Sequence, residues 1–116
     1  MKKLCAVLAA VMLLAMCGSA FALRHMDREE KYVRDEAARR GMKLLTVVEV
    51  REIAAKQFEA GNVSVKEVEL EDEWDDYPNA DRFRPVYKVE CYVGRDEYDI
   101  DIDAVTGKVL KLKLDD

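Results

Sequence analysis

Three alternating carboxylates near the C-terminus are the residues in this sequence that most resemble a chemical site. Asp99, Asp101 and Asp103 could offer oxygen ligands to calcium, but a helix–loop–helix calcium loop needs Gly at its sixth position and Glu at its twelfth. Counted from Asp99, those positions hold Ala104 and Leu110. We therefore expect Asp99 and Asp101 to form solvent-exposed charge pairs across a sheet, and Asp103 to cap a turn with its side chain.

Other residue types that catalysis requires are scarce. His25 is the only histidine, and we expect it to be solvated near the N-terminus of the processed chain. The sequence has no glycine-rich phosphate loop, and any acidic chain offers carboxylate pairs without a pocket to hold them. We therefore predict that the protein is not an enzyme and has no catalytic residue, metal site or cofactor.

The N-terminus has the three parts of a secretory signal peptide. Lys2 and Lys3 form a charged region, residues 4–16 form an apolar run, and Ala20 and Ala22 complete an A-x-A cleavage motif. The apolar run is short for a membrane span, which favours cleavage after Ala22 over an uncleaved anchor. The sequence therefore predicts a periplasmic or secreted protein.

These features divide the chain into three parts. Residues 1–22 are the predicted signal peptide, residues 23–44 a charged N-terminal helix and connector, and residues 45–116 the folded domain. Cys17 resembles a lipoprotein cysteine, but Met16 stands where a small residue is expected. Simple cleavage is therefore favoured over lipidation.

Processing changes both the charge and the cysteine content. Without Lys2 and Lys3, 17 of the 19 basic residues remain against 24 acidic ones, a net charge of −7. Such a chain should repel nucleic acid and anionic lipid, whose binding depends on Lys and Arg patches. Cys5 and Cys17 leave with the signal peptide, so Cys91 remains alone, and we expect it to be a small buried thiol.

The last third of the chain alternates apolar and charged residues, which predicts strands with one buried face. A three-residue turn over 105–107, with Gly107 at positive φ, would pair residues 96–103 with residues 109–114. The predicted partners are Tyr98–Leu114, Asp99–Lys113, Ile100–Leu112, Asp101–Lys111 and Ile102–Leu110. A turn at Gly94-Arg95 would likewise set Cys91 beside Tyr98, Val89 beside Ile100 and Tyr87 beside Ile102. Slipping by one residue would bury charges, so this register is favoured.

A charged helix is predicted to begin the processed chain. Asp27 and Glu30 have the spacing of a capping box, and Gly41 is placed to end the helix. Acid-before-base pairs four residues apart should form on its surface: Glu30–Arg34, Asp35–Arg39 and Glu36–Arg40. Its apolar stripe is thin, so we expect it to pack weakly at an edge.

A second helix and a first strand should follow. Thr46 and Glu49 form a capping box that opens a helix to Ala60. The strand covers residues 63–71, and its inward parity changes within it, which predicts a β-bulge near Lys66.

Together these elements predict an α+β fold in which two N-terminal helices pack on one face of a four-stranded antiparallel sheet. The predicted inward-facing residues are Val50, Ile53, Ala54, Phe58, Val68, Leu70, Tyr87, Val89, Cys91, Tyr98, Ile100, Ile102, Leu110 and Leu112.

The segment 72–85 is the least regular part of the sequence, and it carries both acids and aromatics. Long irregular loops are often functional, and interfaces need an aromatic or apolar centre. We expect Trp74 and Tyr77 to anchor a protein partner while Asp75 and Asp76 steer a basic one, and we include Phe83 in the same surface. The alternative is that Trp74 and Phe83 fold back to seal the edge of the sheet.

The order of these motifs resembles a PepSY domain, a small exported module that also occurs in propeptides of thermolysin-type metalloproteases. The resemblance covers residues 45–114 and rests on Ala54-Ala55 in the helix, on 85-PVYKV-89 and on 98-YDIDIDAVTGKV-109. The arrangement also resembles the fold of the β-lactamase inhibitor protein. The resemblance implies core and turn residues in common, and no catalytic residue.

The functional expectation follows from that resemblance. It implies a non-catalytic exported binding module that inhibits or regulates a secreted peptidase or another envelope protein. The alternative from a different class is a small-ligand or calcium-sensing module in the cell envelope that uses the acidic loop and the strand carboxylates.

Overall fold

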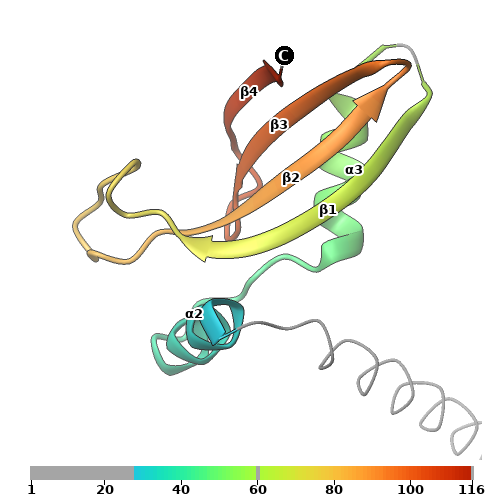
Figure 1. The fold of residues 1–116 in the computed structure, drawn as a ribbon. Coiled ribbons are helices and arrows are strands. Elements are labelled where there is room, and N and C mark those ends of the chain that lie inside the picture. Colours follow the sequence, from blue (N-terminus) through green and yellow to red (C-terminus); the bar gives the residue numbers. More distant parts are fainter. Residues whose placement is uncertain (1–27, 60, 116) are drawn as a thin grey trace, which may run out of the picture.

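The computed structural model describes residues 28–59 and 61–115, so the predicted signal peptide and Asp27 lie outside the described residues. Two helices precede four strands: α2 Arg28–Arg39, α3 Val47–Lys56, β1 Val63–Asp72, β2 Pro85–Val93, β3 Asp96–Asp103 and β4 Val109–Asp115. The strands form one antiparallel sheet in the order β1-β2-β3-β4 (Figure 1). This confirms the predicted α+β fold.

The predicted bulge in β1 is present. Val65 pairs with Cys91 and Glu67 pairs with Glu90, so Lys66 is the extra residue between them. After the bulge Val68 and Leu70 lie opposite Val89 and Tyr87, which returns the apolar residues of β1 to the core side. Bulges of this kind shift the parity of a strand by one residue.

The register of the C-terminal hairpins is confirmed except beside the last turn. Tyr98, Asp99, Ile100 and Asp101 lie opposite Leu114, Lys113, Leu112 and Lys111, as predicted. Ile102, however, pairs with Val109, so the predicted Ile102–Leu110 pair is wrong. Asp103 N–H donates to Lys108 O at 2.8 Å. Lys108 therefore lies opposite Asp103, and not opposite Ala104 as a three-residue turn would require. Leu110 is left as the bulged residue, and Val109 packs against the core in its place.

The turn itself is built by Asp103 and Gly107. As predicted, Asp103 caps the turn: its Oδ1 accepts from the backbone N–H groups of Val105 and Thr106, each at 2.9 Å. Gly107 has φ +80°, and a Cβ there would lie 3.0 Å from Ile53 Cδ1 and 3.3 Å from Leu45 Cδ1. The turn therefore packs directly against α3 and its approach, which leaves no room for a side chain.

The capping box of α3 is confirmed, but the helix is shorter than predicted. Thr46 Oγ1 accepts from Glu49 N–H, and Glu49 Oε1 accepts from Thr46 N–H at 3.0 Å. The helix ends at Lys56 rather than at Ala60, which lies outside the described residues. Phe58 leaves the helical path, and its ring packs 4.8 Å from that of Tyr98.

Helix α2 is tied to the domain through a narrow apolar side. Val33 and Ala37 are completely buried in the core cluster that also holds Val50 and Ala54 of α3. Gly41 ends the helical segment at φ +73°. Two of the three predicted ion pairs form, Glu30–Arg34 and Glu36–Arg40. The predicted Asp35–Arg39 pair is wrong, because Lys31 takes Asp35 and Glu36 takes Arg39.

The core contains most of the predicted inward residues, with exceptions on β4. Tyr87, Val89, Cys91, Ile100 and Ile102 are fully buried. Leu112 was expected inside but is 43% exposed, because α3 stops short of covering β4. The free thiol of Cys91 is buried as predicted, and that burial raises its pKa. No helix within residues 28–59 and 61–115 has the length and apolar character needed to cross a membrane.

Candidate functional site in the loop between β1 and β2

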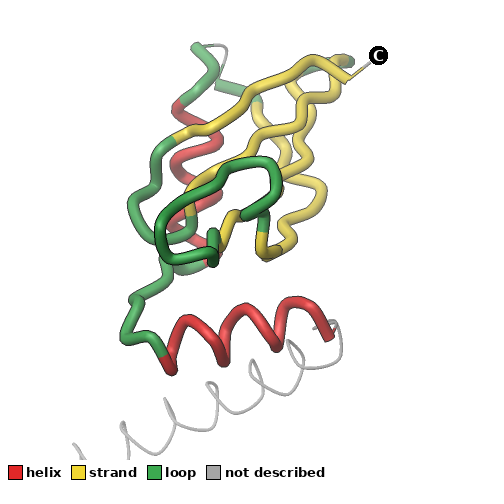
Figure 2. The backbone as a smooth tube through the Cα atoms, turned by 90° about the vertical axis from the view of Figure 1, so that its left-hand side faces the viewer, coloured by secondary structure: helices red, strands yellow, loops and turns green. Residues whose placement is uncertain are grey.

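The irregular segment predicted from the sequence is the loop that joins β1 to β2. It projects beyond the ends of these two strands (Figure 1) and folds back on itself as a compact loop (Figure 2). Asp72 closes its base, since Asp72 Oδ1 accepts from Trp74 N–H at 3.2 Å and from Arg84 N–H at 2.9 Å. Glu73 N–H also donates to Arg84 O at 2.8 Å, so the loop begins and ends at one hydrogen-bonded neck.

Asn79 holds the interior of the loop together. Its side-chain amide donates to Phe83 O at 3.0 Å and accepts from Phe83 N–H at 3.3 Å. Its backbone oxygen accepts from Trp74 Nε1–H at 3.2 Å. The two arms of the loop are therefore connected through one residue, which is why a segment of this length keeps a defined path.

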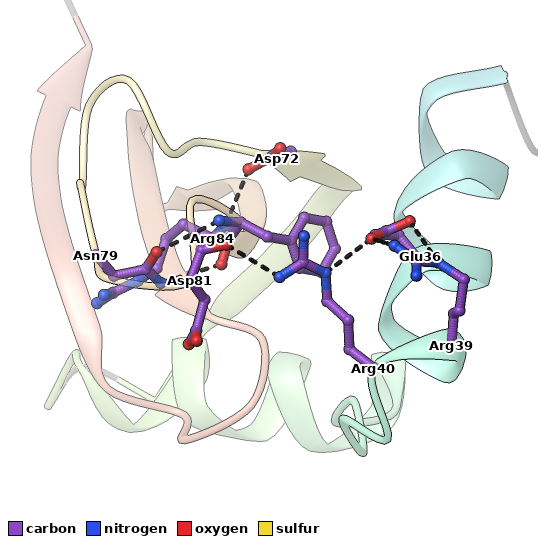
Figure 3. Close-up of polar contacts among 8 residues, drawn as sticks. Glu36, Arg39, Arg40, Asp72, Asn79, Asp81 and Arg84 are labelled. Carbon is purple, nitrogen blue, oxygen red and sulfur yellow. Dashed lines mark hydrogen bonds and ion pairs between the residues drawn. The ribbon is translucent and has the colours of Figure 1, made fainter.

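Arg40 connects the loop to α2. Its Nη1–H donates to Asp81 O at 3.0 Å, and its guanidinium lies 4.9 Å from the centre of the Phe83 ring. On the helix side, Arg40 Nε–H donates to Glu36 Oε1 at 2.7 Å, and Figure 3 shows the side chain reaching between Glu36 and the loop. The same Glu36 carboxylate also binds Arg39, and these hydrogen bonds lower the pKa of Glu36.

Two further contacts fix the loop to the sheet. The hydroxyl of Tyr77 donates to Asp101 Oδ2 of β3 at 2.7 Å. Arg84 Nε lies 3.1 Å from Asp103 Oδ2, an ion pair whose N–H does not point closely enough at the carboxylate to form a hydrogen bond. Asp101 is therefore buried, at 8% exposure, so the expected solvent-exposed Asp101–Lys111 pair is wrong in its environment although its register is right. The sequence indicated that Asp101 and Lys111 would pair, but it could not show that the loop would cover Asp101.

A group of ion-paired side chains lies where the loop meets the sheet. Lys88 Nζ lies 3.0 Å from Glu73 Oε1 and 3.7 Å from Glu71 Oε2. Burial raises the pKa of Glu73 to about 7, aided by hydrogen bonding with Asp76 and Glu71, although the hydrogen bond from Lys88 acts in the opposite direction. Burial alone would lower the pKa of Lys88, but its hydrogen bond and charge interaction with Glu73 raise it. Burial and the hydrogen bond to Asp101 also raise the pKa of Tyr77.

An open groove of about 230 Å³ adjoins this group on the outer face of the sheet. Its lining includes Glu67, Glu69, Glu90, Asp99 and Asp101, with Lys88 and Lys111. Acids outnumber bases there, so the groove extends the negative charge of the loop across the sheet. Among residues 28–59 and 61–115, no group of three or more His, Cys, Asp or Glu is placed to hold a metal ion.

The five residues expected to contact a partner do not share one environment. Asp75 and Asp76 are exposed, Trp74 and Tyr77 are half-buried, and Phe83 is 1% exposed. Phe83 therefore belongs to the buried core, while the other four residues remain at least partly at the surface. Sequence reasoning placed Arg40 only in an ion pair with Glu36 and gave Glu73 no role in the site. Only their contacts with distant segments give them a role.

One comparison with known proteins identifies a family. The family model described as peptidase propeptide and YPEB domain, PepSY, matches residues 44–113. Comparisons with curated proteins and with solved structures gave no match. The family match covers α3, the strands β1 to β3, most of β4 and the candidate loop, which are the elements on which the resemblance was based. The chain therefore belongs to the PepSY domain family.

Proposed function

We propose that this protein is an exported, non-catalytic binding module that inhibits or regulates a secreted peptidase or another envelope protein. PepSY domains are generally propeptide-like modules without catalysis, they are associated with peptidase regulation, and they are commonly exported. The observation that carries the proposal for this chain is the loop between β1 and β2. It is attached to both α2 and β3, yet it leaves acidic and aromatic groups at the surface.

The attachment of the loop supports binding because it reduces the entropy that a partner must overcome. Arg40 holds the loop on the helix side and Tyr77 holds it on the sheet side. Asn79 and the Asp72 neck fix the path between these two points. A surface that is ordered before association loses less conformational freedom when it binds.

The composition of the loop surface indicates the kind of partner. Trp74 is half-buried, with its indole N–H already bonded inside the loop, so its exposed part offers apolar area rather than a hydrogen-bond donor. Asp75 and Asp76 are exposed beside it, and the groove on the outer face adds further acids. A complementary surface therefore carries Lys or Arg around an apolar contact, and the acids would raise its association rate.

An inhibition assay tests this proposal. The processed chain is titrated against a thermolysin-type metallopeptidase and against the peptidases secreted by the same cells, with a quenched-fluorescence peptide as substrate. We expect saturable inhibition of at least one enzyme. The double substitution Asp75→Asn with Asp76→Asn should weaken inhibition about three- to tenfold, more at low salt than at high salt.

The matched control changes the same charge at a distance. Glu52 and Glu59 are exposed acids outside the loop, so the double substitution Glu52→Gln with Glu59→Gln should leave inhibition unchanged. Equal effects of the two double variants would show that overall charge, rather than the loop, controls binding. Absence of inhibition of every peptidase, together with no complex in a pull-down, would refute the proposal.

A further inference from the structure

Within residues 28–59 and 61–115, strand β4 has one side without a neighbouring strand. In the sheet order β1-β2-β3-β4 it is an edge, and its residues pair with β3 alone. The other edge, β1, is bulged at Lys66 and packs against both helices, most extensively against α2. Figure 1 shows β4 at the far side of the sheet from β1, ending near the C-terminus. Bulges and covering helices block strand addition, and after the bulge at Leu110 the strand β4 is regular.

The core-facing side of β4 is apolar and poorly covered. Leu112 is 43% exposed and Leu114 is 44% exposed. The ring of Tyr98, which packs on that of Phe58, lies directly opposite Leu114. The apolar layer of the sheet therefore continues to the edge, where both leucines stay partly uncovered by the described residues.

The opposite side of β4 carries two lysines that face acids of β3 across the sheet. Lys111 lies opposite Asp101 and Lys113 lies opposite Asp99 in the register. Within the part of the chain that the structure describes, neither lysine has a carboxylate within 4.0 Å. Asp101 Oδ2 instead accepts a hydrogen bond from the hydroxyl of Tyr77. The edge therefore presents leucines on one face and unpaired lysines on the other.

A second copy of β4 is a poor match for this edge. Antiparallel self-pairing about Leu112 sets Lys111 against Lys113 of the other copy, and pairing about Lys113 sets that residue against itself. Shifting by one residue opposes leucine to lysine across the two faces. Like charges directly opposite each other destabilise strand pairs.

We propose that the free edge of β4 binds an extended segment of a partner protein in which apolar and acidic residues alternate. The segment adds a fifth antiparallel strand, with its main chain bonded to β4. Its apolar residues cover Leu112 and Leu114, and its carboxylates pair with Lys111 and Lys113. This surface lies on a different element from the loop between β1 and β2, so the inference goes beyond the proposed function and does not depend on it.

Peptide binding measures this directly. A fluorescein-labelled peptide of alternating Glu and Val is titrated with the processed chain, alongside a Lys/Val peptide of equal length. The Glu peptide should bind saturably and at least tenfold more tightly than the Lys peptide. Hydrogen exchange should slow at backbone amides of β4 and not of β1. N-methylation of alternate peptide bonds on the bonding side should abolish binding.

Variants assign the effect to the edge. The double substitution Lys111→Glu with Lys113→Glu should reverse the preference between the two peptides. The double substitution Leu112→Thr with Leu114→Thr keeps the β propensity of these exposed sites. It should weaken binding of the Glu peptide at least fivefold. Thermal unfolding of each variant confirms folding. The loop variant Asp75→Asn with Asp76→Asn should bind the Glu peptide normally, so failure here and failure of the loop proposal are distinguishable.

Four outcomes would overturn the inference. Three of them are equal binding of both peptides, protection of β1 instead of β4, and no saturable binding of either peptide. Concentration-dependent self-association of the processed chain with protection of β4 would also overturn it, because a second copy would then occupy the edge.

Discussion

The hydroxyl of Tyr77 donates a 2.7 Å hydrogen bond to Asp101 Oδ2, joining the loop between β1 and β2 to a strand 24 residues further along the chain. Asp101 belongs to an alternating run whose charges were expected to face water, but its exposure is only 8%. The bond supplies the donor that a nearly buried carboxylate requires. It also explains why the loop lies against the sheet instead of extending from it.

Tyr77→Phe tests this attachment. The substitution keeps the ring and removes the donor, so Asp101 loses its partner while remaining buried. We expect the free energy of unfolding to fall by about 1–3 kcal/mol, measured by urea denaturation. Tyr32→Phe is the control, because Tyr32 is 56% exposed on α2 and should change stability by less than about 0.5 kcal/mol. Equal effects of the two substitutions would show that the bond does not stabilise the fold.

The pKa of Glu73 predicts a pH dependence of stability. Its folded-state pKa is about 7, against an ordinary value of 4.5 that we take for the unfolded chain. Between these values the folded protein binds more protons than the unfolded chain, so stability falls as pH rises from about 4.5 to about 7. Glu73→Gln cannot ionise and should flatten this slope. Urea unfolding at pH 5, 6, 7 and 8 compares the two proteins, and identical slopes would contradict the assignment.

Gly107 and Gly94 form a matched pair for backbone substitution. Both have positive φ, +80° and +66°, but only at Gly107 would a Cβ meet side chains, at 3.0 Å from Ile53 and 3.3 Å from Leu45. Gly94→Ala should cost about 1–2 kcal/mol for the conformation alone. Gly107→Ala should cost about 1–3 kcal/mol more, because the side chains of Ile53 and Leu45 must move aside. Equal losses in denaturant unfolding would show that the turn does not pack tightly on the helix.

Ile100 and Leu112 face each other across β3 and β4, but they differ in burial. Ile100 is completely buried, whereas Leu112 is 43% exposed. Ile100→Ala should therefore lower the free energy of unfolding by about 2–5 kcal/mol. Leu112→Ala should cost less, about 1–2 kcal/mol, since that side chain is only partly buried. A loss below about half a kilocalorie for Ile100→Ala would contradict its place in the core.

Calcium titration distinguishes the two functional classes. A ligand that binds only the folded protein raises its melting temperature, so a calcium-sensing module should show a saturable shift at millimolar calcium. The proposed protein-binding module should show no shift beyond that produced by magnesium at equal ionic strength. A large calcium-specific shift that disappears with Asp99→Asn would favour the sensing alternative instead.

Local patterns in the sequence determined much of the fold. Alternation with a period of two set the pairing of Tyr98–Asp101 with Lys111–Leu114, because a slip by one residue would exchange the buried and charged faces. The capping box of Thr46 and Glu49 joins residues only three apart, and the Asp103 cap reaches two and three residues ahead. Such interactions close within a few residues, so the order of residue types is enough to predict them.

Tertiary structure decided the burial and the surroundings of individual side chains. Asp101 is buried where Tyr77 contacts it, and the path of the loop depends on Arg40, which follows α2 and lies 41 residues before its acceptor Asp81. The raised pKa of Glu73 arises mainly from burial, which outweighs the opposing effect of Lys88 on β2. The exposure of Leu112 depends on which part of the sheet the helices cover, and no pattern within β4 encodes that. These properties depend on what covers a residue, and the covering groups are brought there only when distant segments pack together.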